Sequence, residues 1–195
     1  LAPRRRAQKV LQIGDFLKSI ENLKEGRYDS ISKSDKSITH LQEKISELLP
    51  KITAQIHEMN KSKEFERFLQ RIFENLPNTI SIQNGFGWKT DHGADLIVEF
   101  ENPIVNVNVT TKLIVQAKSY TGNHFDTNAI DQIVTGISKY NADAGLLITT
   151  ARETENLEEY IREKSEEIGK TIDLIAGDDV AKFVLRYAPE ILIGN

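Results

Sequence analysis

Three polar residues, Asp95, Gln116 and Lys118, stand at the ends of two apolar runs that read as consecutive strands. In the stretch DLIVEFENPIVNVNVTTKLIVQAKSY, Asp95 opens the first run, while Gln116 and Lys118 close the second. An unpaired ammonium is costly to remove from water, so a lysine at the end of a buried strand needs a partner. Carboxylate and amide oxygens are ligands of hard divalent cations, and an adjacent ammonium can orient a water or offset phosphate charge.

A hairpin would bring these residues together. If the two runs pair as antiparallel strands that turn at Asn102 and Pro103, the start of the first lies beside the end of the second. Side chains two apart on a strand share a face, so Gln116 and Lys118 are expected to point the same way, toward Asp95. The structural alternative is that the stem of Lys118 packs while its head reaches water, and that Asp95 only caps a strand.

The elements that would position these residues follow from the periodicity. The stretches TISIQ, ADLIVEF, TKLIVQAK, AGLLITT and TIDLIAG are alternating or near-continuous β-rich runs, which are typical of strands. Helical spacing predicts helices over 62–76, 126–140 and 154–168, and a short helix that ends at Tyr187. The order α-β-β-β-α-β-α-β-α predicts an α/β domain with a mixed central sheet flanked by helices.

The first of these helices carries two acidic residues beside its apolar stripe. At about 100° per residue, Glu66 and Glu64 lie at opposite edges of that stripe, so both carboxylates border the core. The stripe itself consists of Phe65, Phe68, Leu69, Ile72, Phe73 and Leu76, and Ser62 is a candidate cap.

Residues 1–60 read as a linker and helical extension, and residues 61–195 as the main domain. From Ile38 onward, apolar residues recur every three or four positions: Ile38, Leu41, Ile45, Leu48, Ile52 and Met59. Pro50 interrupts this seam, and a proline inside a helix costs about 3 kcal/mol. The seam is therefore either a dimerising coiled coil or a helix that docks on a domain.

Composition limits the class of protein. None of the 195 residues is cysteine, which excludes disulfides and thiolate metal sites and favours a reducing, cytoplasmic location. No apolar run approaches the roughly 20 residues needed to cross a bilayer, so no membrane association is expected. The chain begins at Leu1 without the pattern of a secretory signal, and we expect it to be a piece of a longer protein.

The net charge of −4 is unevenly distributed. Residues 1–60 hold 11 Lys and Arg against 8 Asp and Glu, residues 61–195 hold 14 against 21, and residues 152–179 alone hold 4 against 10. A nucleic-acid binder usually presents a basic face. This balance weighs against autonomous tight DNA binding and leaves room for a local site.

Four segments together resemble the Mrr-type restriction endonuclease domain of the PD-(D/E)xK nuclease superfamily. They are GFGWKTDHGADLIVEF, LIVQAKSY, GLLITTARET and IDLIAGDDVAKFV, and the resemblance covers roughly residues 63–185. It implies the restriction-endonuclease-like αβββαβ core. It also implies that the chain is a metal-dependent DNA endonuclease domain, the catalytic module of a restriction or defence enzyme.

The resemblance also assigns roles to residues. It implies that Asp95, Gln116 and Lys118 form the catalytic triad, with Glu66 as a further acidic member and Glu64 as its alternative. Asp95, Gln116 and Glu66 would hold Mg²⁺, for which Mn²⁺ could substitute. The resemblance implies that the family's glycine-aspartate turn before the motif aspartate corresponds to Asp91 and Gly93, although the usual adjacent pair is altered here.

The expected partner is DNA. Lys89, Tyr120 and Arg152 are the candidates for contacting it, either through phosphates or by stacking. Because the domain is poor in basic residues, we expect a specificity or NTPase domain upstream in the full-length protein, or a homodimer. The alternatives are a resolvase or repair nuclease acting on branched or damaged DNA, and a binding or structural domain of the same fold that lacks strong activity.

Overall fold

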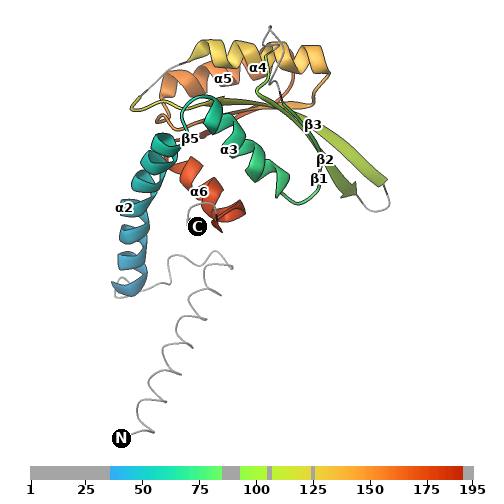
Figure 1. Cartoon of the computed structure of the whole chain (residues 1–195). Coiled ribbons are helices and arrows are strands. Elements are labelled where there is room, and N and C mark those ends of the chain that lie inside the picture. The colour runs from blue at the N-terminus through green and yellow to red at the C-terminus, as the bar shows by residue number, and fades with distance from the viewer. Residues whose placement is uncertain (1–35, 85–92, 105–106, 124–125, 191–195) are drawn as a thin grey trace, which may run out of the picture. The chain divides into compact units, whose positions relative to one another are not determined.

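The computed structural model describes residues 36–84, 93–104, 107–123 and 126–190 (Figure 1). The chain divides into two compact units, Leu1–Ser46 and Glu47–Asn195. The second unit contains the whole sheet and every helix from α3 (Lys63–Glu74) onward. Among the described helices, none is both long and apolar enough to cross a membrane.

One mixed sheet of five strands forms the centre of the second unit. The strands are β1 (Thr79–Asn84), β2 (Leu96–Ile104), β3 (Val107–Lys118), β4 (Ala144–Thr149) and β5 (Ile172–Ala176). They lie in the order β1-β2-β3-β4-β5, with β1, β2 and β3 antiparallel and β3, β4 and β5 parallel. The predicted mixed sheet and the predicted order of elements are confirmed.

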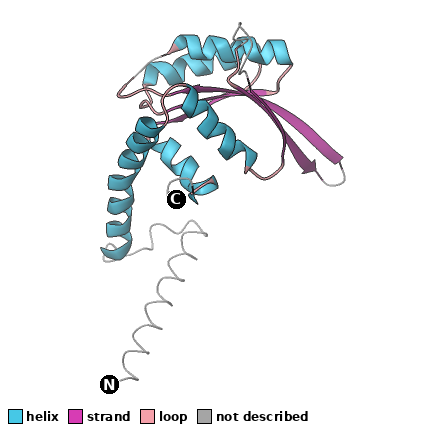
Figure 2. Cartoon of the chain, viewed as in Figure 1, coloured by secondary structure: helices cyan, strands magenta, loops and turns pink. Residues whose placement is uncertain are grey.

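Helices cover both faces of the sheet, as Figure 2 shows. On one face, α3 and α6 (Asp178–Tyr187) pack with Leu96, Val98 and Val115 in one apolar cluster. On the other face, α4 (Thr127–Tyr140) and α5 (Glu155–Ile168) pack with Ile97 and Ile114 in a second cluster. Successive residues of β2 and β3 therefore alternate between the α3 face and the α4 face.

Helix α3 buries the predicted stripe. Phe65, Phe68, Leu69, Ile72 and Phe73 are all buried. Ser62 occupies the N-cap position with a φ of 53°, but its side chain makes no capping hydrogen bond. The helix is therefore fixed by its apolar face rather than by the predicted cap.

The hairpin between β2 and β3 is longer than predicted. Asn102 and Pro103 do not form the turn, because β2 continues to Ile104 with Pro103 opposite Asn108. The N–H of Glu101 points to the β1 side, where it donates to the carbonyl of Asn78 at 2.8 Å. The nitrogen of Pro103, two residues on, faces the same side beyond the end of β1, so a proline removes no bond to β3.

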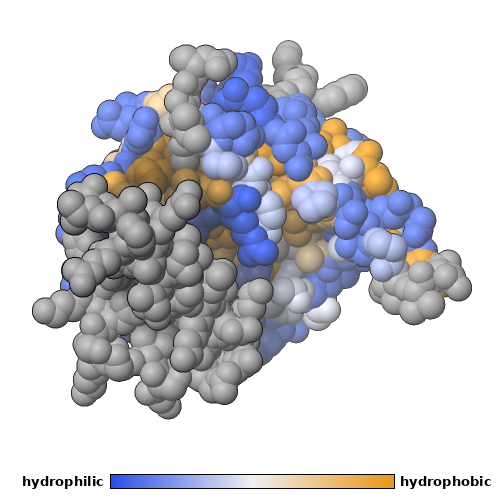
Figure 3. All heavy atoms as spheres, turned by 90° about the horizontal axis from the view of Figure 1, so that it is seen from below, coloured by the Kyte–Doolittle hydropathy of each residue, from blue (hydrophilic) through white to orange (hydrophobic). Residues whose placement is uncertain are grey.

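The outer part of this hairpin is exposed. Val107 and Val109 keep 63% and 41% of their surface accessible, whereas Ile114 and Val115 on the same strand are fully buried. In the view from below, patches of apolar residues, in orange, alternate with polar residues, in blue, over the described surface (Figure 3).

Helix α2 (Lys36–Met59) runs through Pro50, where the sequence predicts an interruption. Pro50 is exposed, so water can hydrate the carbonyl that the missing N–H leaves without a helical partner. Within residues 42–59 of α2, the buried positions are Leu49, Thr53 and Ile56, and Ile56 joins the core cluster on the α3 face. The last turns of α2 are thus part of the compact unit that begins at Glu47.

Candidate active site at the end of strand β3

Asp95 is held against the end of β3 by two hydrogen bonds. Its backbone N–H donates to the carbonyl of Val115 at 3.0 Å. Its Oδ2 accepts from the N–H of Ala117 at 2.7 Å. Since β2 begins only at Leu96, the carboxylate satisfies a donor of β3 that no strand residue reaches. The capping role that the sequence offered as an alternative is therefore real, and it also fixes the carboxylate beside the middle residue of Gln116-Ala117-Lys118.

Gln116 carries an unusual buried oxygen. The side chain is 4% exposed, and its Oε1 is the one buried side-chain polar atom without a hydrogen-bond partner among the described residues. An unsatisfied buried acceptor costs about 1–3 kcal/mol. The strand alternation places Gln116 on the α4 face, and the register of β2 and β3 continues to set Asp95 opposite it. A neutral oxygen and a carboxylate at this position fit a hard divalent cation.

The metal-ligand set is small. The described residues contain no group of three or more His, Cys, Asp or Glu side chains arranged to hold a metal ion. A cation at this site would therefore depend on one or two carboxylates, the Gln116 amide oxygen and water, which is the way Mg²⁺ is often bound.

Lys118 is half-buried and reaches α4. Its Nζ lies 3.5 Å from Oε1 of Gln132, which is a long contact with a neutral group. Lys118 and Gln116 are two residues apart and lie on the same face of the sheet, as predicted. Within the described residues, the ammonium therefore contacts an amide on α4 and no carboxylate.

Two glycines set the approach to Asp95. Gly93 has a φ of 82°, and a Cβ there would collide with the carbonyl of Gln132 on α4. A Cβ on Gly136 would lie 2.5 Å from the carbonyl of Gly93 and 2.9 Å from a methyl of Ile114. The backbone before Asp95 therefore rests directly on α4, which only glycine permits. Sequence reasoning missed Gly136 and Gln132, and the available signal was a glycine inside an amphipathic helix.

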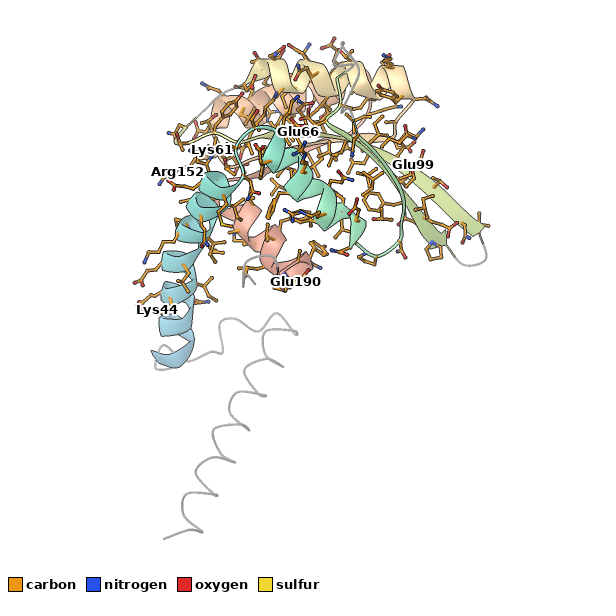
Figure 4. All side chains as sticks on the ribbon, viewed as in Figure 1. Lys44, Lys61, Glu66, Glu99, Arg152 and Glu190 are labelled. Carbon is orange, nitrogen blue, oxygen red and sulfur yellow. The ribbon has the colours of Figure 1, made fainter. Side chains whose placement is uncertain are left out.

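Glu66 is placed differently from the triad. It is half-buried in the first turns of α3, on the helix that covers the face opposite to α4 (Figure 4). Gln116 and Lys118 lie on the α4 face. The role of Glu66 as a metal ligand stays a prediction, and it would have to act around the end of the strands. Glu64 is exposed on the same helix.

The predicted DNA-contacting residues lie in different settings. Lys89 falls outside the described residues, as does Asp91. Arg152 is exposed, three residues after the end of β4. The hydroxyl of Tyr120 donates to Oδ2 of Asp126 at 3.1 Å, and burial, followed by this hydrogen bond, raises the pKa of the phenol. Asp126 also caps α4, so Tyr120 is tied to the start of that helix.

Comparison with known proteins identifies the family. The Mrr catalytic-domain family model, described as "Restriction endonuclease", matches residues 56–184. The solved structure of the DNA modification-dependent restriction endonuclease AspBHI is similar at a TM-score of 0.55 and 16% identity, covering 77% of this chain and 39% of that chain. The MspJI restriction endonuclease in complex with a 27-mer oligonucleotide is similar at a TM-score of 0.51 and 13% identity, covering 72% and 33%.

None of the curated proteins compared with the chain matches it. At these identities the two solved structures support the fold alone, and the chain spans well under half of the length of each. The family match covers about two thirds of the chain and includes Asp95, Gln116 and Lys118. The chain therefore belongs to the Mrr catalytic-domain family of restriction endonucleases, whose members are DNA-cleaving hydrolases.

Proposed function

We propose that the chain is a divalent-metal-dependent endodeoxyribonuclease that hydrolyses DNA phosphodiester bonds as the catalytic module of a larger restriction or defence enzyme. The observation that carries this proposal is the placement of three groups at one end of β2 and β3. They are the Asp95 carboxylate, the unpartnered Oε1 of Gln116 and the ammonium of Lys118.

Asp95 and Gln116 are the residues that would hold the cation, with Glu66 as a third ligand, direct or through water. Mg²⁺ is the expected ion and Mn²⁺ a substitute. When bound, such an ion polarises a phosphate oxygen and lowers the pKa of a coordinated water. The Ala117 N–H fixes the orientation of the Asp95 carboxylate beforehand, so no reorganisation of this ligand is required on binding.

Lys118 supplies the positive charge of the site. Its contact with Gln132 leaves the ammonium charge uncompensated by that neighbour. The ammonium is therefore suited to orient the attacking water and to offset charge that develops on the phosphate in the transition state. Because an amide is a weaker partner than a carboxylate, a phosphate can displace it at low cost.

DNA affinity would come partly from elsewhere. The described residues beside the site offer few cations, and Lys89, Tyr120 and Arg152 are the proposed contacts within the chain. The modest basic content supports an upstream specificity or NTPase domain, and cleavage of both strands would require a second copy of the site.

Plasmid cleavage tests the proposal. Supercoiled plasmid is incubated with the chain in Mg²⁺, in Mn²⁺ and in EDTA, and the matched variant is Asp95→Asn. This variant keeps an oxygen that can accept from Ala117 but removes the negative charge. We expect nicking that requires the metal and is lost in the variant while its melting temperature is retained.

Equal behaviour of the two proteins, or cleavage that persists in EDTA, would contradict the proposal. Four-way junctions and linear duplex are compared in the same assay. A strong preference for junctions would favour the resolvase alternative over a restriction role.

A further inference from the structure

Helix α2 ties together the carboxyl ends of all three parallel strands. Ser119, Thr150 and Gly177 each directly follow a strand, namely β3, β4 and β5. Thr53 donates to the carbonyl of Gly177 at 3.0 Å. Nδ1 of His57, one turn further along α2, lies 2.9 Å from the hydroxyl of Ser119 and 3.3 Å from that of Thr150. The carboxyl ends of parallel strands are where α/β proteins place their ligand sites.

The hydrogen-bond donors at this junction decide which atom of His57 carries a proton. The Ser119 hydroxyl donates to the carbonyl of Asn60 at 2.9 Å. The Thr150 hydroxyl donates to the carbonyl of Tyr120 at 2.8 Å. Each hydroxyl has a single hydrogen, so both can only accept from His57. Nδ1 of His57 therefore carries a proton, and this one N–H donates to both hydroxyls.

The Nδ1–H of His57 contacts the segment that directly follows Lys118. Ser119 is the residue after Lys118, and the backbone N–H of Tyr120 in turn donates to the Thr150 hydroxyl at 3.0 Å. His57 thus contacts, directly or through one hydroxyl, the two residues that follow Lys118. The half-buried ring is held by the end of α2, where Ile56 and Asn60, the residue after the helix, are buried.

We propose that His57 is a positioning residue for Lys118: its Nδ1–H holds Ser119 and Thr150, and thereby fixes the end of β3 that carries Gln116 and Lys118. The role rests on the proposed nuclease function. With this role, the last turns of α2 would help to position the catalytic residues, although the sequence analysis assigned residues 1–60 to an extension outside the main domain. A misplacement of about 1 Å at a reacting group can cost about 100-fold in rate.

Two substitutions at His57 distinguish the effect of its hydrogen-bond donor from the effect of its side-chain volume. In His57→Asn the side-chain amide can place an N–H near the position of Nδ1, with loss of ring volume. In His57→Leu the volume is retained and the donor is lost. We expect kcat for plasmid nicking within about threefold of the native protein for the asparagine variant, and at least tenfold lower for the leucine variant, with KM for DNA unchanged in both.

Thr53→Val is the matched control on the same helix. It removes the hydrogen bond to Gly177 at the end of β5, away from Lys118, and it is expected to lower the melting temperature without lowering kcat. A leucine variant as active as the native protein would overturn the proposal. So would a ranking in which leucine is tolerated and asparagine is not, because packing alone would then explain the site.

Amide hydrogen exchange gives a readout that does not need cleavage. The N–H of Tyr120 is expected to exchange at least tenfold faster in His57→Leu than in His57→Asn, while the N–H of Val115 exchanges equally in both. If the native chain cuts no DNA, the proposed function fails but this exchange pattern still tests the positioning. Equal exchange of Tyr120 in all variants would overturn it.

Discussion

Strand β3 carries two lysines, Lys112 and Lys118, whose hydrogen-bond partners differ in charge. In the middle of the strand, Lys112 forms an ion pair with Glu99 directly across the hairpin at 3.1 Å, and Glu99 also accepts from the hydroxyl of Ser81 at 2.7 Å. At the end of the strand, the contact of Lys118 within the described residues is a long one with a glutamine amide. Both residues belong to the same strand and the same hairpin.

We expect this difference to separate a structural lysine from a functional one. Lys112 has an acidic partner set by strand register, which accounts for its presence without any ligand. Lys118 sits beside an unpartnered buried amide oxygen and a carboxylate engaged by the backbone, an arrangement that costs stability. Sites that retain such a cost are those where the groups are needed for binding or catalysis.

The largest expected effect distinguishes the two lysines directly. Lys118→Met should lower the rate of plasmid nicking by about 100-fold or more, because it removes a charge that stabilises the transition state. Lys112→Met should change the rate by less than about twofold, since its ammonium belongs to a partly exposed ion pair. Single-turnover rates at saturating Mg²⁺ measure both. Equal losses in the two variants would erase the distinction.

The next effect concerns the buried oxygen. Gln116→Leu should abolish most of the stabilisation by divalent metal, which for the native chain would reach about 2.7 kcal/mol at a metal concentration 100 times Kd. Without metal, the variant should be as stable as the native chain or more stable, because it removes an unsatisfied acceptor. Thermal unfolding with and without Mg²⁺ measures this difference. A variant that still gains stability from the metal would show that Gln116 is not a ligand.

A third effect contrasts packing at the two ends of the strand. Gly136→Ala should cost about 1–3 kcal/mol in the free energy of unfolding, because its Cβ meets the carbonyl of Gly93 and a methyl of Ile114. Thr110→Ala, at the exposed end, should change it by less than about 0.5 kcal/mol. Urea denaturation measures both. A tolerated alanine at 136 would mean that the approach to Asp95 is not fixed by this contact.

Several features of the fold were readable from the sequence because they are local. The stripe from Phe65 to Phe73 and the alternation that sets Gln116 and Lys118 on one face depend on residues close in the chain. The proximity of Asp95 to the end of β3 was predicted from antiparallel pairing, but the register was not, because the turn was placed at Asn102 and Pro103. In the observed hairpin Ile104 is opposite Val107, which sets Asp95 opposite Gln116, whereas a tight turn at Asn102 and Pro103 would have set Asp95 opposite Thr110.

The features that were missed depend on contacts between distant residues. Nothing near His57 in the sequence announces Ser119 or Thr150, which lie 62 and 93 residues away. The fit of Gly93 against Gly136 is likewise visible only once α4 is laid on the sheet. The continuity of α2 through Pro50 depends on exposure at that position, which a sequence pattern does not report.

The smallest effect is the pH dependence of stability that arises from Glu99, the partner of Lys112. The hydrogen bond from Ser81, then the one from Lys112, lowers the pKa of Glu99. A carboxyl whose pKa is lower in the folded chain contributes stability above its unfolded pKa of about 4.3 and loses it as the pH falls through the folded value.

Ser81→Ala should therefore reduce the free energy of unfolding by less than about 1 kcal/mol at pH 7, and the difference should vanish in acid. Urea midpoints at pH 7 and pH 3 measure this. A difference that grows toward acid would have the wrong sign for this carboxyl.

Pro103 has a consequence for the chain in a concentrated solution. Beyond Glu101, whose N–H donates to the carbonyl of Asn78, the outer edge of β2 has no neighbouring strand in the described part of the chain, and up to Ile104 the only nitrogen that faces outward belongs to Pro103. An extended segment from another molecule would find no donor there to begin a ladder, so the β2 edge of this protruding ribbon is protected from edge-to-edge aggregation.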